Sequence, residues 1–158
     1  MFKKFLTTKS VCLSAMIAAL YAALTLLLAP ISYGAIQCRI SEAMTLLPML
    51  LPHAVPGLVV GCLVSNLLSP VAIWDVLFGT LATLLAAVGT RHFRSTPVLA
   101  ALCPIVSNGL IVGGTLSIFY GLPLWLTMLE VAAGEALAVL LGFLLLRALR
   151  RVNLTRYQ

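Results

Sequence analysis

Long apolar runs separated by short polar segments dominate the chain. A helix needs about 20 mostly apolar residues to cross the hydrocarbon layer of a bilayer. Runs of this length predict membrane-spanning helices at about 10–29, 72–90, 96–118 and 123–147. The pattern therefore predicts an all-α integral membrane protein.

The segment 41–70 is also apolar, but prolines interrupt it, so that it fits either one broken helix or two. The positions of the basic residues decide between one helix and two. Lys and Arg accumulate in cytoplasmic loops, and three parts of this chain are basic: the N-terminal end, the C-terminal end and the segment 91–94. All three lie on one side only if 41–70 crosses twice, as helices of about 42–52 and 57–70. The prediction is a single domain, 1–158, built as a six-transmembrane-helix bundle with cytoplasmic N- and C-termini.

Composition supports lipid as the solvent of this chain. Apolar residues make up 62% of it and charged residues 9%, whereas soluble domains average about 25% charged residues. The net charge of +6 does not indicate nucleic-acid binding, because the bases cluster beside apolar runs and no nucleic-acid-binding motif accompanies them. The sequence has no P-loop, H-E-x-x-H or G-x-S-x-G motif. We therefore expect no enzyme, no cofactor and no metal ion.

All acidic residues of the chain fall within predicted helices, at Glu42, Asp75, Glu130 and Glu135. A carboxylate near the bilayer centre costs roughly 2.5–3.5 kcal/mol on insertion scales, so such residues face a cavity or a partner. Asp75 is the least costly, because it begins a helix, where the macrodipole is positive. Glu130 lies roughly 12 Å below the outer end of its helix. The acids indicate an outward-facing cavity.

An amide and several aromatic residues belong to the same outer half. Asn108 falls at a depth similar to that of Glu130, while the aromatic residues also suit the aromatic belt of a membrane interface. Such a cavity suits a small, flat solute that forms hydrogen bonds and carries positive charge. The candidate substrate-binding residues are Glu42, Asn66, Trp74, Asp75, Asn108, Tyr120, Trp125, Glu130 and Glu135.

Small residues recur at helical spacing in the first predicted helix, at Ala15, Ala19 and Ala23, with Ala18 and Ala22 beside them. Such stripes let helix backbones approach closely in a membrane. From the residues alone, packing inside the bundle and contact with a partner protein are both open.

Three stretches, "APISYGAIQCRISEAMTLLPML", "LPHAVPGLVVGCLVSNLLSP" and "WDVLFGTLATLLAA", resemble the queuosine precursor transporter family, QueT. The resemblance implies a substrate-binding S component of an energy-coupling factor (ECF) transporter, in a prokaryotic plasma membrane. It also implies partners, a membrane T component and two ABC ATPases, with the T component packed on the alanine stripe of the first helix. The implied substrate is a deazaguanine, most readily the aminomethyl form (preQ1), with the cyano form (preQ0) and queuine as alternatives.

The resemblance further makes the loop before Ser41 a candidate lid over the solute, carrying Tyr33, Gln37 and Arg39. We expect Glu42 to contact the solute and Arg39 to hold the lid, with an ion pair between them at i,i+3 spacing. Other readings remain open at this point: an S component for another vitamin or purine-like heterocycle, a small intramembrane enzyme, or a structural membrane subunit.

Overall fold

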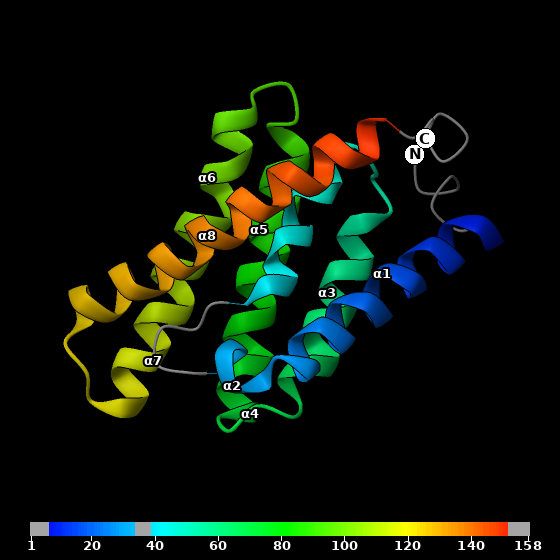
Figure 1. Cartoon of the computed structure of the whole chain (residues 1–158). Helices are drawn as coiled ribbons and strands as arrows, with labels where there is room; N and C mark the ends of the chain where they lie inside the picture. Colours follow the sequence, from blue (N-terminus) through cyan, green and yellow to red (C-terminus); the bar gives the residue numbers. More distant parts are fainter. Residues whose placement is uncertain (1–6, 34–38, 152–158) are drawn as a thin grey trace.

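The computed structural model describes residues 7–33 and 39–151, and these residues form helices and turns with no strand. Gln37 of the expected lid lies outside the described residues. The helices, with 3₁₀ and π segments labelled η, pack as a bundle that α8 crosses obliquely (Figure 1). In chain order they are α1 (Thr8–Leu27), α2 (Ala29–Ser32), η2 (Ile40–Met49), α3 (Ala54–Asn66), α4 (Ala72–Trp74), η3 (Asp75–Gly79), α5 (Thr80–His92), α6 (Pro97–Ser107), η4 (Asn108–Val112), α7 (Gly113–Tyr120) and α8 (Leu124–Arg150).

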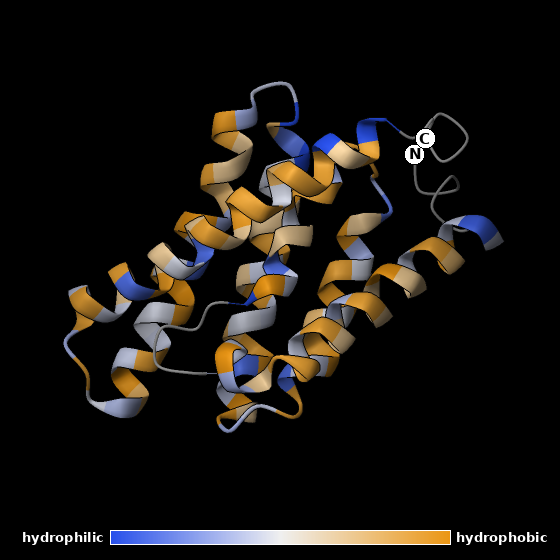
Figure 2. Ribbon diagram, viewed as in Figure 1, coloured by the Kyte–Doolittle hydropathy of each residue, from blue (hydrophilic) through white to orange (hydrophobic). Residues whose placement is uncertain are grey.

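Within the described ranges, 4 helices are long and apolar enough to cross a membrane. They are Thr8–Leu27, Ala72–His92, Pro97–Tyr120 and Leu124–Arg150, and α3 adds a shorter apolar helix of 13 residues. Hydrophobic residues cover these helices along most of their length (Figure 2). An all-helical, multi-pass membrane architecture is thus confirmed, whereas the count of six spans and the side on which the termini lie stay predictions.

The segment η2 is a 3₁₀-helix of 10 residues, where the sequence predicts a short helix of about 42–52. Pro48 has no backbone N–H and disfavours α geometry in the residue before it. A 3₁₀-helix rises about 2.0 Å per residue instead of 1.5 Å, so η2 reaches about 20 Å instead of about 15 Å. All residues from Ser41 to Met49 are buried, and η2 contacts α1, α3, α5, α6 and α8. It is the central element of the bundle.

Glycines bring α1 and α3 into close contact. A Cβ atom at Gly57 would lie 2.7 Å from the Ser14 carbonyl oxygen, and one at Gly61 would lie 2.8 Å from that of Ala18. Ala18 and Ala22 are therefore buried, on the side of α1 that faces the bundle. The other three alanines of the predicted stripe, Ala15, Ala19 and Ala23, are exposed.

Two π segments interrupt helices that the sequence predicts as continuous. Asp75 begins η3 and Asn108 begins η4. A π turn adds one residue to a helical turn and redirects the side chains around it, and such turns are frequent at functional sites. Both segments place a buried polar residue in the bundle interior.

Candidate solute-binding site

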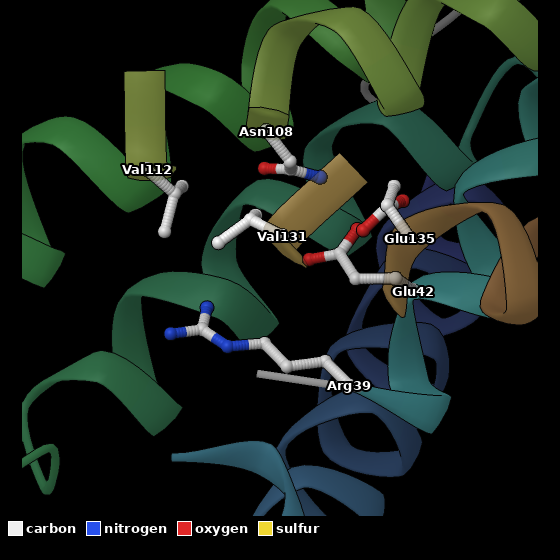
Figure 3. Close-up of a pocket in the computed structure, with 6 residues that line it drawn as sticks. All are labelled: Arg39, Glu42, Asn108, Val112, Val131 and Glu135. Carbon is white, nitrogen blue, oxygen red and sulfur yellow. The ribbon is translucent and has the colours of Figure 1, made fainter. Parts of the chain in front are cut away.

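A polar cavity lies between η2, η4 and α8 (Figure 3). Its space is about 210 Å³, including its open side. Its walls lie close together and leave room for about one water molecule, so a larger solute enters only if they move apart. The residues that line it are Arg39, Glu42, Asn108, Val112, Val131 and Glu135.

Glu42 is held by one of its two carboxyl oxygens. Its Oε1 accepts a hydrogen bond from the Tyr21 hydroxyl and a longer one, of 3.5 Å, from Thr83 Oγ1. Tyr21 and Thr83 are both fully buried at 0% exposure, so water does not compete for these bonds. Glu42 Oε2 is buried and has no hydrogen-bond partner among the described residues. Glu42 therefore offers one fixed acceptor to a solute.

Glu135 and Asn108 also have unsatisfied polar atoms. Glu135 Oε1 and Asn108 Nδ2 are buried with no hydrogen-bond partner within 3.5 Å in the described part of the chain, although the Asn108 amide lies close to the carboxyl groups of both Glu42 and Glu135. The two side chains point toward each other and toward the carboxyl group of Glu42 (Figure 3). A buried polar atom without a partner costs about 1–3 kcal/mol. Such atoms grouped around one cavity indicate a site whose hydrogen bonds are completed by a bound molecule.

Arg39 forms an ion pair with Asp75, at 3.4 Å between Nη2 and Oδ2. Ser69 Oγ donates to the same Asp75 oxygen at 2.5 Å. The expected pair between Arg39 and Glu42 is absent from the structure. Arg39 precedes η2 in an extended conformation, with φ −87° and ψ 101°, so the i,i+3 relationship of a helix does not apply to it.

Arg39 also contacts Tyr33, the other described residue of the predicted lid. Its guanidinium lies 5.5 Å from the centre of the Tyr33 ring, within the range of a cation–π interaction. The Tyr33 hydroxyl donates to the carbonyl oxygen of Ser65 in α3, at 2.7 Å. Burial raises the pKa of Tyr33 above its ordinary value, so this hydroxyl stays a donor at neutral pH. Tyr33 and Arg39 are thus both anchored to the bundle.

The cavity has more carboxyl groups than basic groups. Arg39 is neutralised by Asp75, which leaves the carboxyl groups of Glu42 and Glu135 without a basic partner of their own among the described residues. Placing charge in a poorly hydrated interior is unfavourable unless an opposite charge accompanies it. The arrangement therefore favours a solute that brings positive charge and hydrogen-bond donors.

Three of the expected polar solute contacts, Asn66, Asp75 and Glu130, do not line the cavity. Glu130 is half-buried and does not line the cavity. The five-residue spacing to Glu135 turns the side chains about 140° apart on a helix, so only one of them faces the cavity. Asn66 is fully buried, but its Nδ2 donates to the Asp75 carbonyl oxygen at 2.8 Å, and it supports η3 instead of lining the cavity.

The expected aromatic contacts lie on the outer surface. Trp74, Tyr120 and Trp125 are 43%, 53% and 75% exposed, and none of them lines the cavity. Trp74 stacks on Phe78, with ring centres 5.8 Å apart. Their positions fit the aromatic-belt interpretation of the sequence.

Sequence reasoning missed the residues that hold the site carboxylates: Tyr21, Ser69 and Thr83. Tyr21 carried one available signal, because a Tyr in the middle of an apolar helix needs a partner for its hydroxyl. Ser69 and Thr83 carried none, since single Ser and Thr residues are common in turns and helices and often bond to nearby backbone groups.

A comparison with protein-family models matches residues 11–151 to the family described as QueT transporter. No curated protein and no solved structure matches the chain significantly. The match covers most of the chain and includes every residue that lines the cavity.

Proposed function

The chain belongs to the QueT transporter family, and from that premise we propose that it is the substrate-binding S component of an ECF transporter and binds a deazaguanine. Family membership indicates a transporter of a small molecule, and the apolar helices indicate a multi-pass membrane protein. The finer role rests on the cavity between η2, η4 and α8.

The observation that carries the proposal is the set of unsatisfied polar atoms in this cavity. Glu42 Oε2 and Glu135 Oε1 are acceptors, while Asn108 Nδ2 and Arg39 Nε are donors. The guanine-like edge of a deazaguanine has neighbouring N–H donors beside a carbonyl oxygen. One carboxylate can accept the N–H groups, and an Asn108 or Arg39 nitrogen can donate to the carbonyl oxygen.

The cavity has two carboxyl groups, and the second one favours a deazaguanine whose substituent carries positive charge and N–H donors. An aminomethyl group is a cation at neutral pH and can form charge-assisted hydrogen bonds with the second carboxylate, which are about twice as strong as neutral ones. A cyano group has no donor and no charge. The aminomethyl form is therefore the preferred substrate.

The exposed alanines of α1 suit the T component of the transporter. Ala15, Ala19 and Ala23 form a strip that leaves the backbone of α1 open to a second helix. Ala18 and Ala22 are already used by the packing of α1 on α3. The exposed strip is thus the proposed T-component surface, with two ATPases joining through that partner.

The proposal treats the bundle as six spans with both termini in the cytoplasm. The elements that support this are the 4 long apolar helices together with α3 and the extended η2. The cavity then opens toward the outside, where the solute is captured.

The test is equilibrium binding to the purified full chain in detergent. The ligands are aminomethyl-deazaguanine, cyano-deazaguanine, queuine, guanine and an unrelated vitamin. We expect the aminomethyl form to bind at least about tenfold more tightly than the cyano form, a difference of about 1.4 kcal/mol. Equal affinity for guanine and for the deazaguanines would contradict the substrate assignment and favour an S component for purines.

A further inference from the structure

A second polar pocket lies away from the solute cavity, where η2 and α5 end. Met49, Leu50, Pro52, Arg91 and Arg94 line it, and its space is about 490 Å³ including its open side. It shares no residue with the cavity of Glu42 and Glu135. It therefore needs an explanation separate from solute binding.

The pocket holds concentrated positive charge. Arg91 and Arg94 lie close enough for their charges to repel each other, yet neither has a carboxylate partner in the described part of the chain. The whole sequence has only 4 acidic residues, and none of them lines this pocket. Two neighbouring guanidinium groups without a counter-charge favour binding of an anion.

Arg91 is held in a fixed position. Its Nη1 donates to the Pro48 carbonyl oxygen at 3.1 Å, which ties α5 to the end of η2. A guanidinium group has five N–H donors, so most of those of Arg91 stay free for an anion. Arg94 is exposed and stands in the turn between α5 and α6. The pair thus combines one anchored and one exposed guanidinium group.

The remaining walls identify the class of anion. Met49 and Leu50 are apolar and belong to a helix end of the membrane bundle. A phosphate group suits paired guanidinium groups, because its oxygens accept two parallel hydrogen bonds from each. An apolar wall beside such a pair, near the surface of a membrane, matches a phospholipid, whose headgroup and acyl chain lie side by side.

We propose that Arg91 and Arg94 form a binding site for a phosphate group, presented by an anionic phospholipid of the adjacent leaflet. The site lies in the same end of the bundle as the start of α1 and the end of α8 (Figure 1). Bound lipid there bridges the ends of η2 and α5, and so stabilises the helix that carries Glu42. The proposal does not depend on the identity of the transported solute.

The experiment uses the full chain in nanodiscs of phosphatidylcholine with a small fraction of phosphatidylglycerol, and native mass spectrometry counts retained phosphatidylglycerol. The variants are Arg91→Gln with Arg94→Gln, and Arg94→Gln alone, which leaves the Arg91–Pro48 hydrogen bond intact. The matched control is Arg147→Gln with Arg150→Gln, which removes the same charge from exposed positions of α8. The midpoint of thermal unfolding verifies that each variant is folded.

We expect the double variant to retain on the order of tenfold less phosphatidylglycerol than wild type. Arg94→Gln alone should retain an intermediate amount, and the control should retain as much as wild type. Equal loss in the double variant and the control would overturn the proposal, since it would show attraction by net charge alone. Unchanged retention in both pocket variants would also overturn it. A further arm adds inorganic phosphate: displacement of the lipid at millimolar phosphate supports the phosphate site but assigns it to a free anion, and no displacement supports the lipid.

Discussion

The hydroxyl group of Tyr21 in α1 donates a hydrogen bond to Glu42 Oε1 in η2. This bond joins the helix that carries the exposed alanine strip to the carboxylate that lines the solute cavity. Thr25 of α1 adds a second link to η2, through a hydrogen bond of 2.6 Å to Ser41 Oγ. The first helix of the chain therefore takes part in arranging the site, although none of its residues lines the cavity.

Removal of the Tyr21 hydroxyl tests this link. In Tyr21→Phe the ring still fills its buried position, but Glu42 Oε1 keeps only the longer bond from Thr83. The loss of a hydrogen bond to a charged group costs about 1.5–3 kcal/mol, so we expect solute affinity to fall by about tenfold or more. Tyr120→Phe is the matched control, because Tyr120 is 53% exposed and does not line the cavity. Equal solute affinity of Tyr21→Phe and wild type would show that the Tyr21 hydrogen bond does not contribute to solute binding.

The Arg39–Asp75 pair is expected to show strong coupling. Asp75→Asn leaves a buried guanidinium group without its counter-charge, which costs about 3–5 kcal/mol when such a pair is broken. The double variant Arg39→Gln, Asp75→Asn removes both charges and should be destabilised by clearly less than the sum of the single variants. The coupling is measured from the midpoints of thermal unfolding in detergent of wild type, Arg39→Gln, Asp75→Asn and the double variant. Additive effects would show that the two charges do not interact.

Close packing of α1 on α3 predicts a penalty for small additions. The Cβ atom in Gly61→Ala would meet the backbone of Ala18, which has no flexible end that can move aside. Overpacking of this kind costs about 1–3 kcal/mol, and we expect a lower unfolding midpoint. Gly114→Ala is the control, because its Cβ would meet only the terminal Cε of Met128, at 3.3 Å. Equal midpoints for the two variants would contradict the close contact of the helices.

The alanine strip predicts a separation of assembly from solute binding. Ala19→Leu fills the exposed strip of α1 and should prevent copurification with a T component, while solute affinity stays within about twofold of wild type. Ala133→Leu is the matched control, since Ala133 is an exposed alanine of α8. If both variants assemble as wild type does, the strip is not the partner surface.

Much of the architecture is predictable from the sequence. Long apolar runs mark the spans because every backbone group in lipid must be paired within a helix. The exact form of η2 is not predictable in this way, since a 10-residue apolar segment with Pro48 fits several helical geometries. The π turns at Asp75 and Asn108 likewise depend on tertiary packing, which hydropathy does not record.

The site is only partly predictable from the sequence. The cost of buried acids marks Glu42 and Glu135 as candidates, but it marks Glu130 equally, because depth along a helix says nothing about which face points inward. The choice between them needs the rotation of α8, and the structure turns Glu135 into the cavity. The partner of Arg39 is unpredictable for a similar reason, because Asp75 lies far away in sequence and meets it only in the folded bundle.

The most direct test of the central claim is solute binding to three carboxyl variants of the purified chain. Aminomethyl-deazaguanine is titrated against wild type, Glu42→Gln, Glu135→Gln and Glu130→Gln. Each cavity variant replaces a carboxyl oxygen with an amide nitrogen that cannot accept from the solute, so we expect its affinity to fall by about tenfold or more, as a loss of about 1.5–3 kcal/mol requires. Glu130→Gln should bind within about twofold of wild type, the range expected for a change away from the site. Loss of binding in Glu130→Gln, with Glu42→Gln and Glu135→Gln unaffected, would contradict the assignment of the cavity.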